Sequence, residues 1–202
     1  MNEKQGELRD RIERLCLLKG RTFRLSTGAL SDYYFDCKRA TLHGDTLQLI
    51  TEEFIARIQE LPLQPSAVAG LTLGADPLVA AIIIRAKQLG LSIVHGSIVR
   101  KERKQHGTES KIENDPEPGT TVVVVDDVIT RGGSIASACR ELIAAGCEVV
   151  GIVALIDREE GGVEHLRESY RCPVHTIFKK SEFRALAQDD SITARGKAAL
   201  GS

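Results

Sequence analysis

The chain has 202 residues and a formal net charge of −1, and 42% of its residues are hydrophobic and 27% charged. These values are ordinary for one globular domain, and they argue against disorder and against a protein that coats nucleic acid by bulk charge. Five Phe, three Tyr and no Trp are also few for a base-stacking surface, so we expect no nucleic-acid partner.

Cysteine use and hydropathy indicate the compartment. The chain has five Cys and no CxxC pair, which favours neither a disulfide framework nor a zinc site and is typical of a reducing cytosol. The longest apolar run, 78–84, stops at Arg85 and falls short of the ~18 residues of a membrane span. The N-terminus, MNEKQGE, leads into no apolar signal-peptide core. We therefore expect a cytoplasmic protein without membrane contact.

The first 43 residues are expected to form a small N-terminal unit. A helix is predicted over 3–18, where Leu8 and Ile12 recur at helical spacing. Two short strands are predicted over 23–25 and 33–36, on either side of a turn-forming segment. We interpret this unit as a cap on the domain that follows.

From about residue 44, strands and helices alternate. The run 122–125 is a continuous apolar strand, typical of a parallel sheet covered by helices on both faces. We predict a single domain whose doubly wound α/β core spans 44–187, followed by a polar tail over 188–202. The expected core elements are a helix carrying Leu47, Ile50, Phe54 and Ile58, strand 66–70, helix 77–89, strands 92–99 and 121–126, helix 134–145, and strands 148–156 and 174–178.

The sharpest chemical signal is the run VVVVDDVITRGGS at 122–134. A buried strand brings Asp126 and Asp127 to its carboxyl end, which is where active sites of such sheets lie. The glycines that follow let successive backbone N–H groups point inward at a helix N-terminus, an arrangement that suits a phosphate. The alternative is a strand that ends in a solvated acidic turn. Neither GxxxxGK[ST] nor GxGxxG occurs in the chain.

This run resembles the phosphoribosyl pyrophosphate (PRPP) loop of the type I phosphoribosyltransferases. The resemblance implies that Asp126 and Asp127, called the acid pair below, hold the ribose hydroxyls of PRPP. It implies that 130–134, called the phosphate loop below, hold the 5-phosphate. The PRPP-binding residues expected from this run are Asp126, Asp127, Val128, Ile129, Thr130, Arg131, Gly132, Gly133 and Ser134.

A second signal is the basic loop that begins with VRKERKQHG at 99–107 and runs to about residue 119. Five basic and two acidic residues lie between 100 and 111, in a chain of net charge −1. In isolation this is a solvated basic loop. Its pattern is similar to the catalytic loop of orotate phosphoribosyltransferases, which closes over the diphosphate, often from the neighbouring subunit. The match falls on Arg100, Lys101, Lys104 and His106 and implies a homodimer with shared active sites.

Three further segments resemble the same family. FRLSTGALSDYYFD at 23–36 is similar to its N-terminal hood, whose second strand lies against the orotate ring and here carries Phe35. GLTLGADPL at 70–78 resembles its pyrophosphate loop. DREEGG at 157–162 resembles its orotate-recognising turn and implies that Arg158 pairs with the orotate carboxylate; alone it is a surface charge cluster. The hood (residues 1–43) and Thr130 complete the expected orotate site.

Three positions depart from the family pattern: Ser26 and Gly74 stand where many relatives have Lys, and Arg131 adds a charge at a position that is often small or neutral. The resemblance nevertheless implies an enzyme that joins orotate to PRPP and yields orotidine 5′-phosphate and diphosphate, in pyrimidine (UMP) biosynthesis. The acid pair, Lys104 and His106 are its expected catalytic residues. Mg²⁺ is expected to bind through PRPP and water, without a direct protein ligand.

Two alternatives remain open from the sequence. A phosphoribosyltransferase for another nucleobase would keep the phosphate loop and change the hood and Arg158. A regulator that senses PRPP without turnover would keep the fold, although no helix-turn-helix is evident near the N-terminus. A separate decarboxylase could act as a partner on the product.

Overall fold

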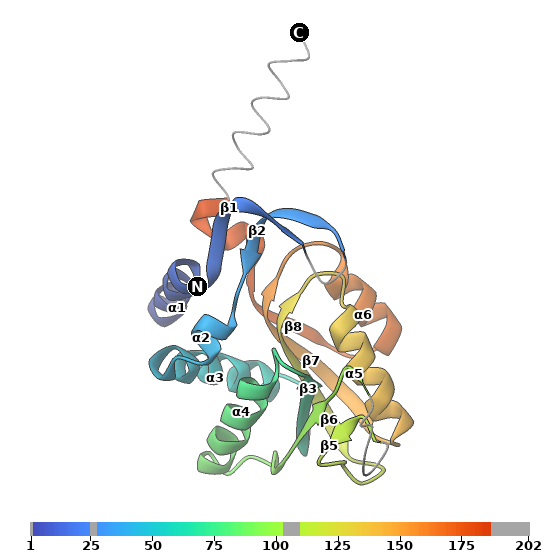
Figure 1. Cartoon of the computed structure of the whole chain (residues 1–202). Helices are drawn as coiled ribbons and strands as arrows, with labels where there is room; N and C mark the ends of the chain where they lie inside the picture. Colours follow the sequence, from blue (N-terminus) through green and yellow to red (C-terminus); the bar gives the residue numbers. More distant parts are fainter. Residues whose placement is uncertain (1, 25–27, 103–109, 187–202) are drawn as a thin grey trace.

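The computed structural model describes residues 2–24, 28–102 and 110–186 (Figure 1). Its main sheet is built from β3 (Ala67–Leu71), β4 (His95–Val99), β5 (Ile112–Glu113), β6 (Thr121–Ile129), β7 (Glu148–Asp157) and β8 (Val174–Lys179). The strand order is β5-β4-β3-β6-β7-β8, and every neighbouring pair is parallel except β4 and β5. This confirms the predicted α/β fold, and it makes the β3–β6 boundary the point where the winding direction of the sheet reverses.

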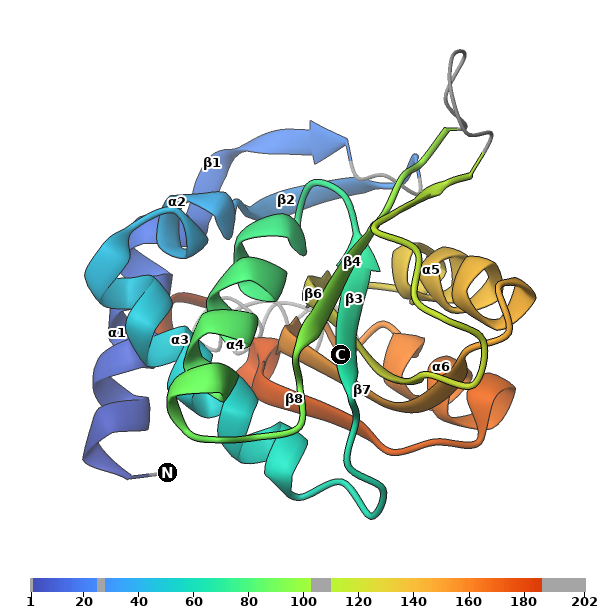
Figure 2. The same ribbon diagram turned by 90° about the horizontal axis from the view of Figure 1, so that it is seen from below.

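Helices cover both faces of this sheet. In Figure 2, α3 (Gly44–Gln59) and α4 (Asp76–Gln88) lie on one face, and α5 (Gly133–Ala144) and α6 (Gly162–Tyr170) lie on the other. Successive strand residues point to opposite faces, so Val123 and Val125 pack in the core beneath α3 and α4, while Val122 and Val124 pack beneath α5. Burial on both sides explains why this strand is apolar without alternation.

The hood consists of α1 (Glu3–Cys16), β1 (Leu17–Arg24), β2 (Leu30–Phe35) and α2 (Lys38–Thr41). The α1 helix begins with a capping box, in which the Gln5 N–H donates to Asn2 Oδ1 at 2.9 Å and the Asn2 N–H donates to Gln5 Oε1 at 3.2 Å. The Phe35 ring lies 5.0 Å from that of Phe183, just after the short helix η1 (Lys180–Glu182). The segment after β8 therefore packs against the hood and helps to hold it over the sheet.

The hood differs from the sequence prediction in where its first helix ends and its first strand begins. The first helix ends at Cys16 rather than at residue 18, because Leu17 and Leu18 pair with Phe35 and Tyr34 of β2. Leucines suit a helix and a strand almost equally, and the long-range pairing decides between them. The short helices α2 and η1 were also not predicted.

The core differs in three places. Helix α6 was not predicted, because its nine residues bury only Gly162, Val163 and Leu166. The basic loop is not open along its whole length, since Ile112 of β5 is buried and pairs with Val99. Strand β6 continues past the acid pair to Ile129, because β7 is long enough to pair with it there. Within the described ranges, no helix has the length and apolar character that crossing a bilayer requires.

Candidate active site

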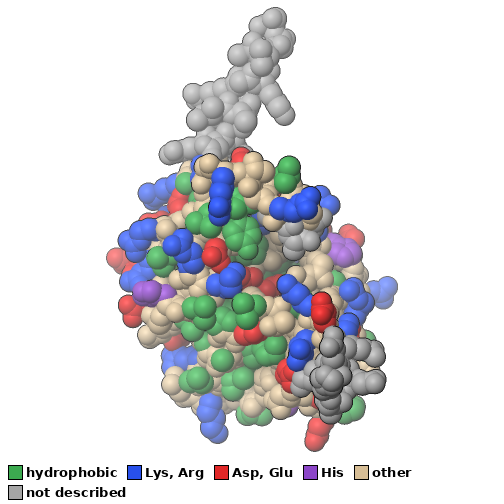
Figure 3. All heavy atoms as spheres, viewed as in Figure 1, with side chains coloured by type: hydrophobic (Ala, Val, Ile, Leu, Met, Phe, Trp, Pro, Cys, Tyr) green, Lys and Arg blue, Asp and Glu red, His purple; other side chains and the backbone are tan. Residues whose placement is uncertain are grey.

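A cavity of about 520 Å³ opens between the hood and the carboxyl ends of the central strands. Strands β3 and β6 pair only as far as Ala69 and Val124, so the chain that follows each of them lines an opening between the two. Figure 3 shows this hollow below the hood, with Lys and Arg side chains around it. Its walls are formed by Leu18, Arg21, Phe23, Arg24, Tyr34, Phe35, Asp36, Lys38, Leu71, Thr72, Leu73, Gly74, Lys101, Asp126, Asp127, Val128, Thr130, Ser134 and Arg158.

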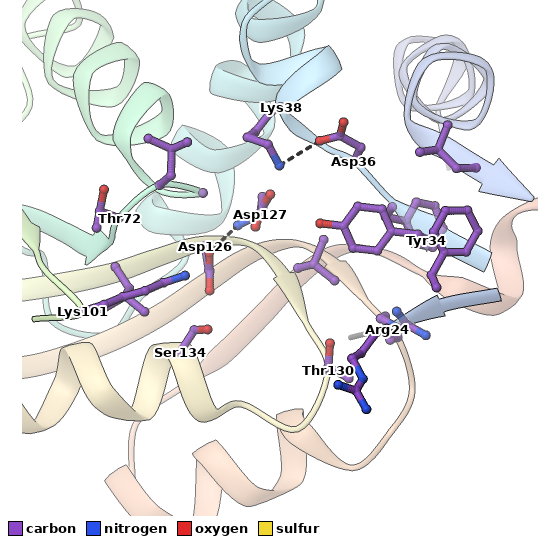
Figure 4. A pocket seen from close by; sticks show the side chains of 18 of the residues that line it. Arg24, Tyr34, Asp36, Lys38, Thr72, Lys101, Asp126, Asp127, Thr130 and Ser134 are labelled. Carbon is purple, nitrogen blue, oxygen red and sulfur yellow. Dashed lines mark hydrogen bonds and ion pairs between the residues drawn. The ribbon is translucent and has the colours of Figure 1, made fainter. Parts of the chain in front are cut away.

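The acid pair lies at the floor of this cavity (Figure 4). Asp126 is 6% exposed, and its Oδ1 accepts a hydrogen bond of 2.9 Å from the Asp127 N–H. Burial, and then the negative charge of Asp127, raise the pKa of Asp126 well above its ordinary value. Burial also raises the pKa of Asp127, although the hydrogen bond to Asp126 and the positive charge of Lys38 act against it. The two carboxyl groups therefore repel one another in a poorly hydrated place, which favours a ligand that brings hydroxyl donors or positive charge.

The phosphate loop lines a second lobe of about 390 Å³. The residues that line both this lobe and the larger cavity are Leu71, Lys101, Asp126, Val128, Thr130 and Ser134. Gly132 precedes α5 with φ 80° and ψ 3°, a left-handed conformation, and a Cβ there would meet Leu166 Cγ at 2.9 Å. No acidic side chain lies in the first turn of α5, and none of the described side chains caps its start. The N-terminal amides of α5 are therefore suited to an anion.

Arg158 lies at the hood end of the cavity and is 4% exposed. Its Nη2 donates to Ser31 Oγ at 3.2 Å, its Nε lies 2.9 Å from Glu160 Oε1, and its guanidinium carbon lies 4.4 Å from the Tyr33 ring centroid. These contacts from two elements fix the orientation of the guanidinium. Arg158 is thus a buried arginine at the cavity and not part of a surface charge cluster, which was the alternative for this segment taken alone. Its planar guanidinium is suited to a carboxylate, the role predicted for it.

The aromatic wall differs in detail from the prediction. Phe35 lines the cavity, but it is 3% exposed and packs between Tyr33 and Phe183 as part of the core. Tyr34, on the other face of β2, stacks on Phe23 with ring centroids 5.8 Å apart and presents a flat apolar surface to the cavity. The alternation of strand side chains is the sequence signal that distinguishes Tyr34 from its neighbours.

The basic loop is only partly placed. Lys101 lines both lobes of the cavity. Arg100 is paired with Glu113 of β5 at 3.0 Å and lines neither lobe of the cavity of its own subunit, so its predicted role in binding PRPP stays a prediction. Lys104 and His106 fall within 103–109, and Ser26 within 25–27, outside the described residues. Their predicted roles stay predictions.

The phosphate-loop run also divides. Val128, Thr130 and Ser134 line both lobes of the cavity, whereas Arg131, Gly132 and Gly133 line only the second lobe. Ile129 is 1% exposed and packs in the core beneath α5, so its side chain does not reach either cavity.

Several basic side chains at the site were not predicted. Arg21 and Arg24 extend from β1, and Lys38 extends from α2, into the walls of the cavity. Lys38 Nζ lies 2.8 Å from Asp36 Oδ1 (Figure 4). Each of these residues lies in or just after a short strand of the hood, among other charged residues. A lysine or arginine in such a segment is ordinarily expected to be exposed to solvent. They reach the cavity because the hood packs over the sheet, and a local sequence pattern does not predict that packing.

Comparison with known proteins agrees with this geometry. Residues 42–186 match the model of the phosphoribosyl transferase domain family. The chain is 44% identical over 162 residues to the orotate phosphoribosyltransferase of Leptospira biflexa serovar Patoc, covering 80% of this chain and 86% of the relative. It is 39% identical over 160 residues to that of Aquifex aeolicus, covering 79% and 85%. The crystal structure of the Mycobacterium tuberculosis enzyme in complex with PRPP is similar at a TM-score of 0.70 and 29% identity, covering 89% and 98%.

Proposed function

Because the chain belongs to the orotate phosphoribosyltransferase family, we propose that its cavity binds PRPP and orotate together and transfers the phosphoribosyl group between them. It is an enzyme of the pentosyltransferase class. The observation that carries the residue assignments is the convergence of three elements on one cavity: the acid pair of β6, the N-terminus of α5 and the buried Arg158 after β7. A reaction between an anionic sugar phosphate and an anionic planar base requires these features in one place.

Each part of PRPP has a matching surface. The 5-phosphate is suited to the phosphate loop and the N-terminus of α5. The ribose hydroxyls are suited to the acid pair, since carboxylates accept charge-assisted hydrogen bonds from them. The diphosphate then lies toward Lys101 and the loop of Thr72, Leu73 and Gly74, which line the cavity beyond the acid pair.

Orotate is assigned to the hood end. Its ring fits the flat surface of Tyr34, and its carboxylate fits the fixed guanidinium of Arg158. Thr130, the first residue of the phosphate loop, lines both lobes and can supply a hydroxyl to either ligand. The attacking ring nitrogen is thereby held on the side of the ribose opposite the departing diphosphate.

The transfer passes through a cationic, oxocarbenium-like state as the bond from the anomeric carbon to the diphosphate breaks. The acid pair lies on the ribose side and stabilises positive charge as it develops, because carboxylates in a poorly hydrated cavity interact strongly with it. Lys101, with Lys104 and His106 of the basic loop, is proposed to bind the departing diphosphate. Closure of that loop also keeps water from the activated ribose.

The residues present fit a Mg²⁺ that arrives with PRPP. The acid pair brings two carboxyl groups together in the cavity, mostly buried from water, and carboxylate oxygens suit a hydrated Mg²⁺. Among the described residues, no group of three or more His, Cys, Asp or Glu side chains is placed to hold a metal. We propose that diphosphate and ribose oxygens and water bind Mg²⁺, with the acid pair nearby, and that the ion neutralises diphosphate charge when it is bound.

We also propose a homodimer in which the basic loop of one subunit serves the site of the other. Exposed apolar side chains support an interface, with Leu42 at 73%, Leu73 at 61% and Ile84 at 62% exposure. They lie on or beside α3 and α4, and Figure 3 shows hydrophobic side chains gathered over this part of the surface. Leu73 also lines the active-site cavity, so an interface here would place the partner close to the diphosphate end.

A steady-state assay tests the function. The purified protein is supplied with PRPP and Mg²⁺ and with orotate, adenine, uracil or hypoxanthine, and loss of each base is followed. We expect consumption of orotate alone, with formation of orotidine 5′-phosphate and diphosphate, and no consumption by an Asp126→Asn/Asp127→Asn variant. Consumption of another base would support a different phosphoribosyltransferase. Binding of PRPP without turnover of any base would support a regulator.

A further inference from the structure

Lys38 is a charged side chain in the active-site wall to which the mechanism above gives no role. It comes from the first turn of α2, directly after the hood strands, and lines the larger cavity. Its Nζ is 2.8 Å from Asp36 Oδ1, and the side chain is 38% exposed. An ammonium group has three N–H donors, and Asp36 engages one side of it. The other donors are free to meet a ligand in the cavity.

The charge of Lys38 is coupled to the acid pair. The hydrogen bond to Asp36, and to a smaller extent the negative charge of Asp127, raise the pKa of Lys38, so the ammonium stays charged. In return, Lys38 lowers the pKa of Asp127. Lys38 therefore lies close enough to the acid pair to face whatever part of PRPP binds beyond the ribose hydroxyls.

A glycine lets the loop after β3, which faces Lys38 across the cavity, approach the acid pair closely. A Cβ at Gly74 would lie 2.6 Å from Asp127 Oδ1 and 3.0 Å from Asp126 Oδ1, so the loop after β3 presents backbone rather than a side chain to the acid pair. Thr72 and Leu73 line the same wall. Between this loop and α2 the cavity has room for a ligand group, and Lys38 reaches it from the hood side.

The placement of the two lobes shows which ligand group this is. Thr130 and Ser134 lie on one side of the acid pair, and Lys38 lies on the other (Figure 4). Thr130, Ser134, Lys101 and Asp126 line both lobes, whereas Lys38 lines only the larger one. With the 5-phosphate in the phosphate loop and the ribose on the acid pair, the group beyond the pair is the one attached to the anomeric carbon.

We propose that Lys38 binds the diphosphate of PRPP, with Asp36 orienting its ammonium toward the loop after β3. The proposal rests on the proposed function in taking PRPP as the ligand, with its 5-phosphate in the phosphate loop and its ribose on the acid pair. A diphosphate placed beside two buried carboxylates meets repulsion from them, and a fixed cation on the hood side offsets part of it. Arg158 already supplies the cation at the orotate end, next to Tyr33. In this arrangement Lys38 binds the diphosphate of PRPP, and Arg158 binds the carboxylate of orotate.

Calorimetric titrations of the full chain with Mg²⁺-diphosphate and with ribose 5-phosphate separate the two ends of PRPP. We expect Lys38→Met to weaken diphosphate binding by roughly tenfold or more, since a charge-assisted hydrogen bond is lost, and to leave ribose 5-phosphate binding unchanged. Lys38→Arg should recover most of the affinity. Lys87→Met, an exposed lysine on α4 distant from the cavity lining, is the matched control and should bind both ligands normally.

Steady-state kinetics give a second readout. In Lys38→Met, the KM for PRPP should rise while the KM for orotate stays constant. An equal loss of ribose 5-phosphate and diphosphate affinity would show that Lys38 acts through Asp127 or through folding, and a rise in the KM for orotate alone would place it at the base. Either result overturns the proposal. The titrations contain no orotate, so failure of the enzyme to consume orotate would contradict the proposed function and leave this test intact.

Discussion

Asp126 is buried next to a second carboxyl group, at a position where the rest of β6 is apolar. Removing a carboxylate from water costs free energy, and a neighbouring like charge adds to the cost. Such an arrangement lowers the stability of the protein without ligand. It is expected at a site where a bound ligand supplies hydrogen-bond donors and positive charge to the carboxyl groups. The raised pKa of Asp126 turns this cost into a measurable pH dependence.

We predict that Asp126→Asn stabilises the apoprotein at neutral pH. The folded-state pKa of Asp126 lies above its ordinary value of 3.8, so the folded protein binds more protons than the unfolded chain at pH values between the two. Wild-type stability therefore falls as the pH rises from about 4 through the folded-state pKa, and the Asn variant lacks this loss. Urea unfolding from pH 4 to 8 should show a stability difference that grows with pH. Parallel curves for the two proteins would contradict the prediction.

Arg158 is the residue on which base recognition is predicted to depend. Replacing it with Lys keeps the charge but loses the planar fork that Ser31 and Tyr33 hold in place. We expect the KM for orotate to rise roughly tenfold to a hundredfold, as for the loss of one charge-assisted hydrogen bond, with little change in the KM for PRPP. Arg57→Lys, which alters a surface ion pair with Glu60 on α3, is the control. An unchanged KM for orotate would remove Arg158 from the base site.

At the scale of elements, loops rather than strands carry most of the site. The phosphate loop depends on the left-handed Gly132, and the loop after β3 depends on the close approach of Gly74 to the acid pair. The basic loop has a fixed stem, because the Arg100 N–H donates to Lys111 O at 2.7 Å and Lys111 Nζ lies 2.8 Å from Glu141 of α5. The position of this stem relative to the cavity is thus set by β5 and α5.

Gly74→Ala tests the loop after β3. The new methyl group would lie 2.6 Å from Asp127 Oδ1, so either the loop or the carboxylate must move. A displacement of this kind at reacting groups can lower kcat/KM on the order of a hundredfold. We expect such a loss without a matching loss of thermal stability. Gly6→Ala, in α1 with nothing within 4 Å of its new Cβ, is the control and should keep full activity. Normal kcat/KM in Gly74→Ala would show that the loop tolerates the shift.

At the scale of the whole molecule, the shared-site dimer makes a quantitative prediction. An inactive Asp126→Asn/Asp127→Asn protein is mixed in equal amounts with an inactive Lys104→Ala protein, and the subunits are allowed to exchange. If the basic loop acts on the partner's site, each hybrid dimer has one intact site, and about a quarter of wild-type activity should return, because half of the dimers are hybrids. Exchange without recovery, or an active monomer by light scattering, would exclude shared sites.

Local sequence patterns alone predicted most of the core strands and helices and the position of the anion site. The continuous apolar run 122–125 predicts a parallel strand covered on both faces, and the acids and glycines after it predict an anion site at its carboxyl end, because local periodicity and backbone freedom are properties of short segments. Apart from α6 and β5, the positions of the core helices and strands followed from the same patterns to within a few residues. Gly132 in the left-handed region is one such local requirement that the structure contains.

The tertiary structure decided what local patterns do not encode. Leu17 and Leu18 are strand residues only because β2 pairs with them, and β6 continues past the acid pair only because β7 extends beside it. Arg100, expected at the site, is held by Glu113, while Lys38, in an unremarkable charged segment, lies beside Asp127. The direction in which a long charged side chain points depends on partners distant in the chain, and the packing of the hood over the sheet brings those partners together.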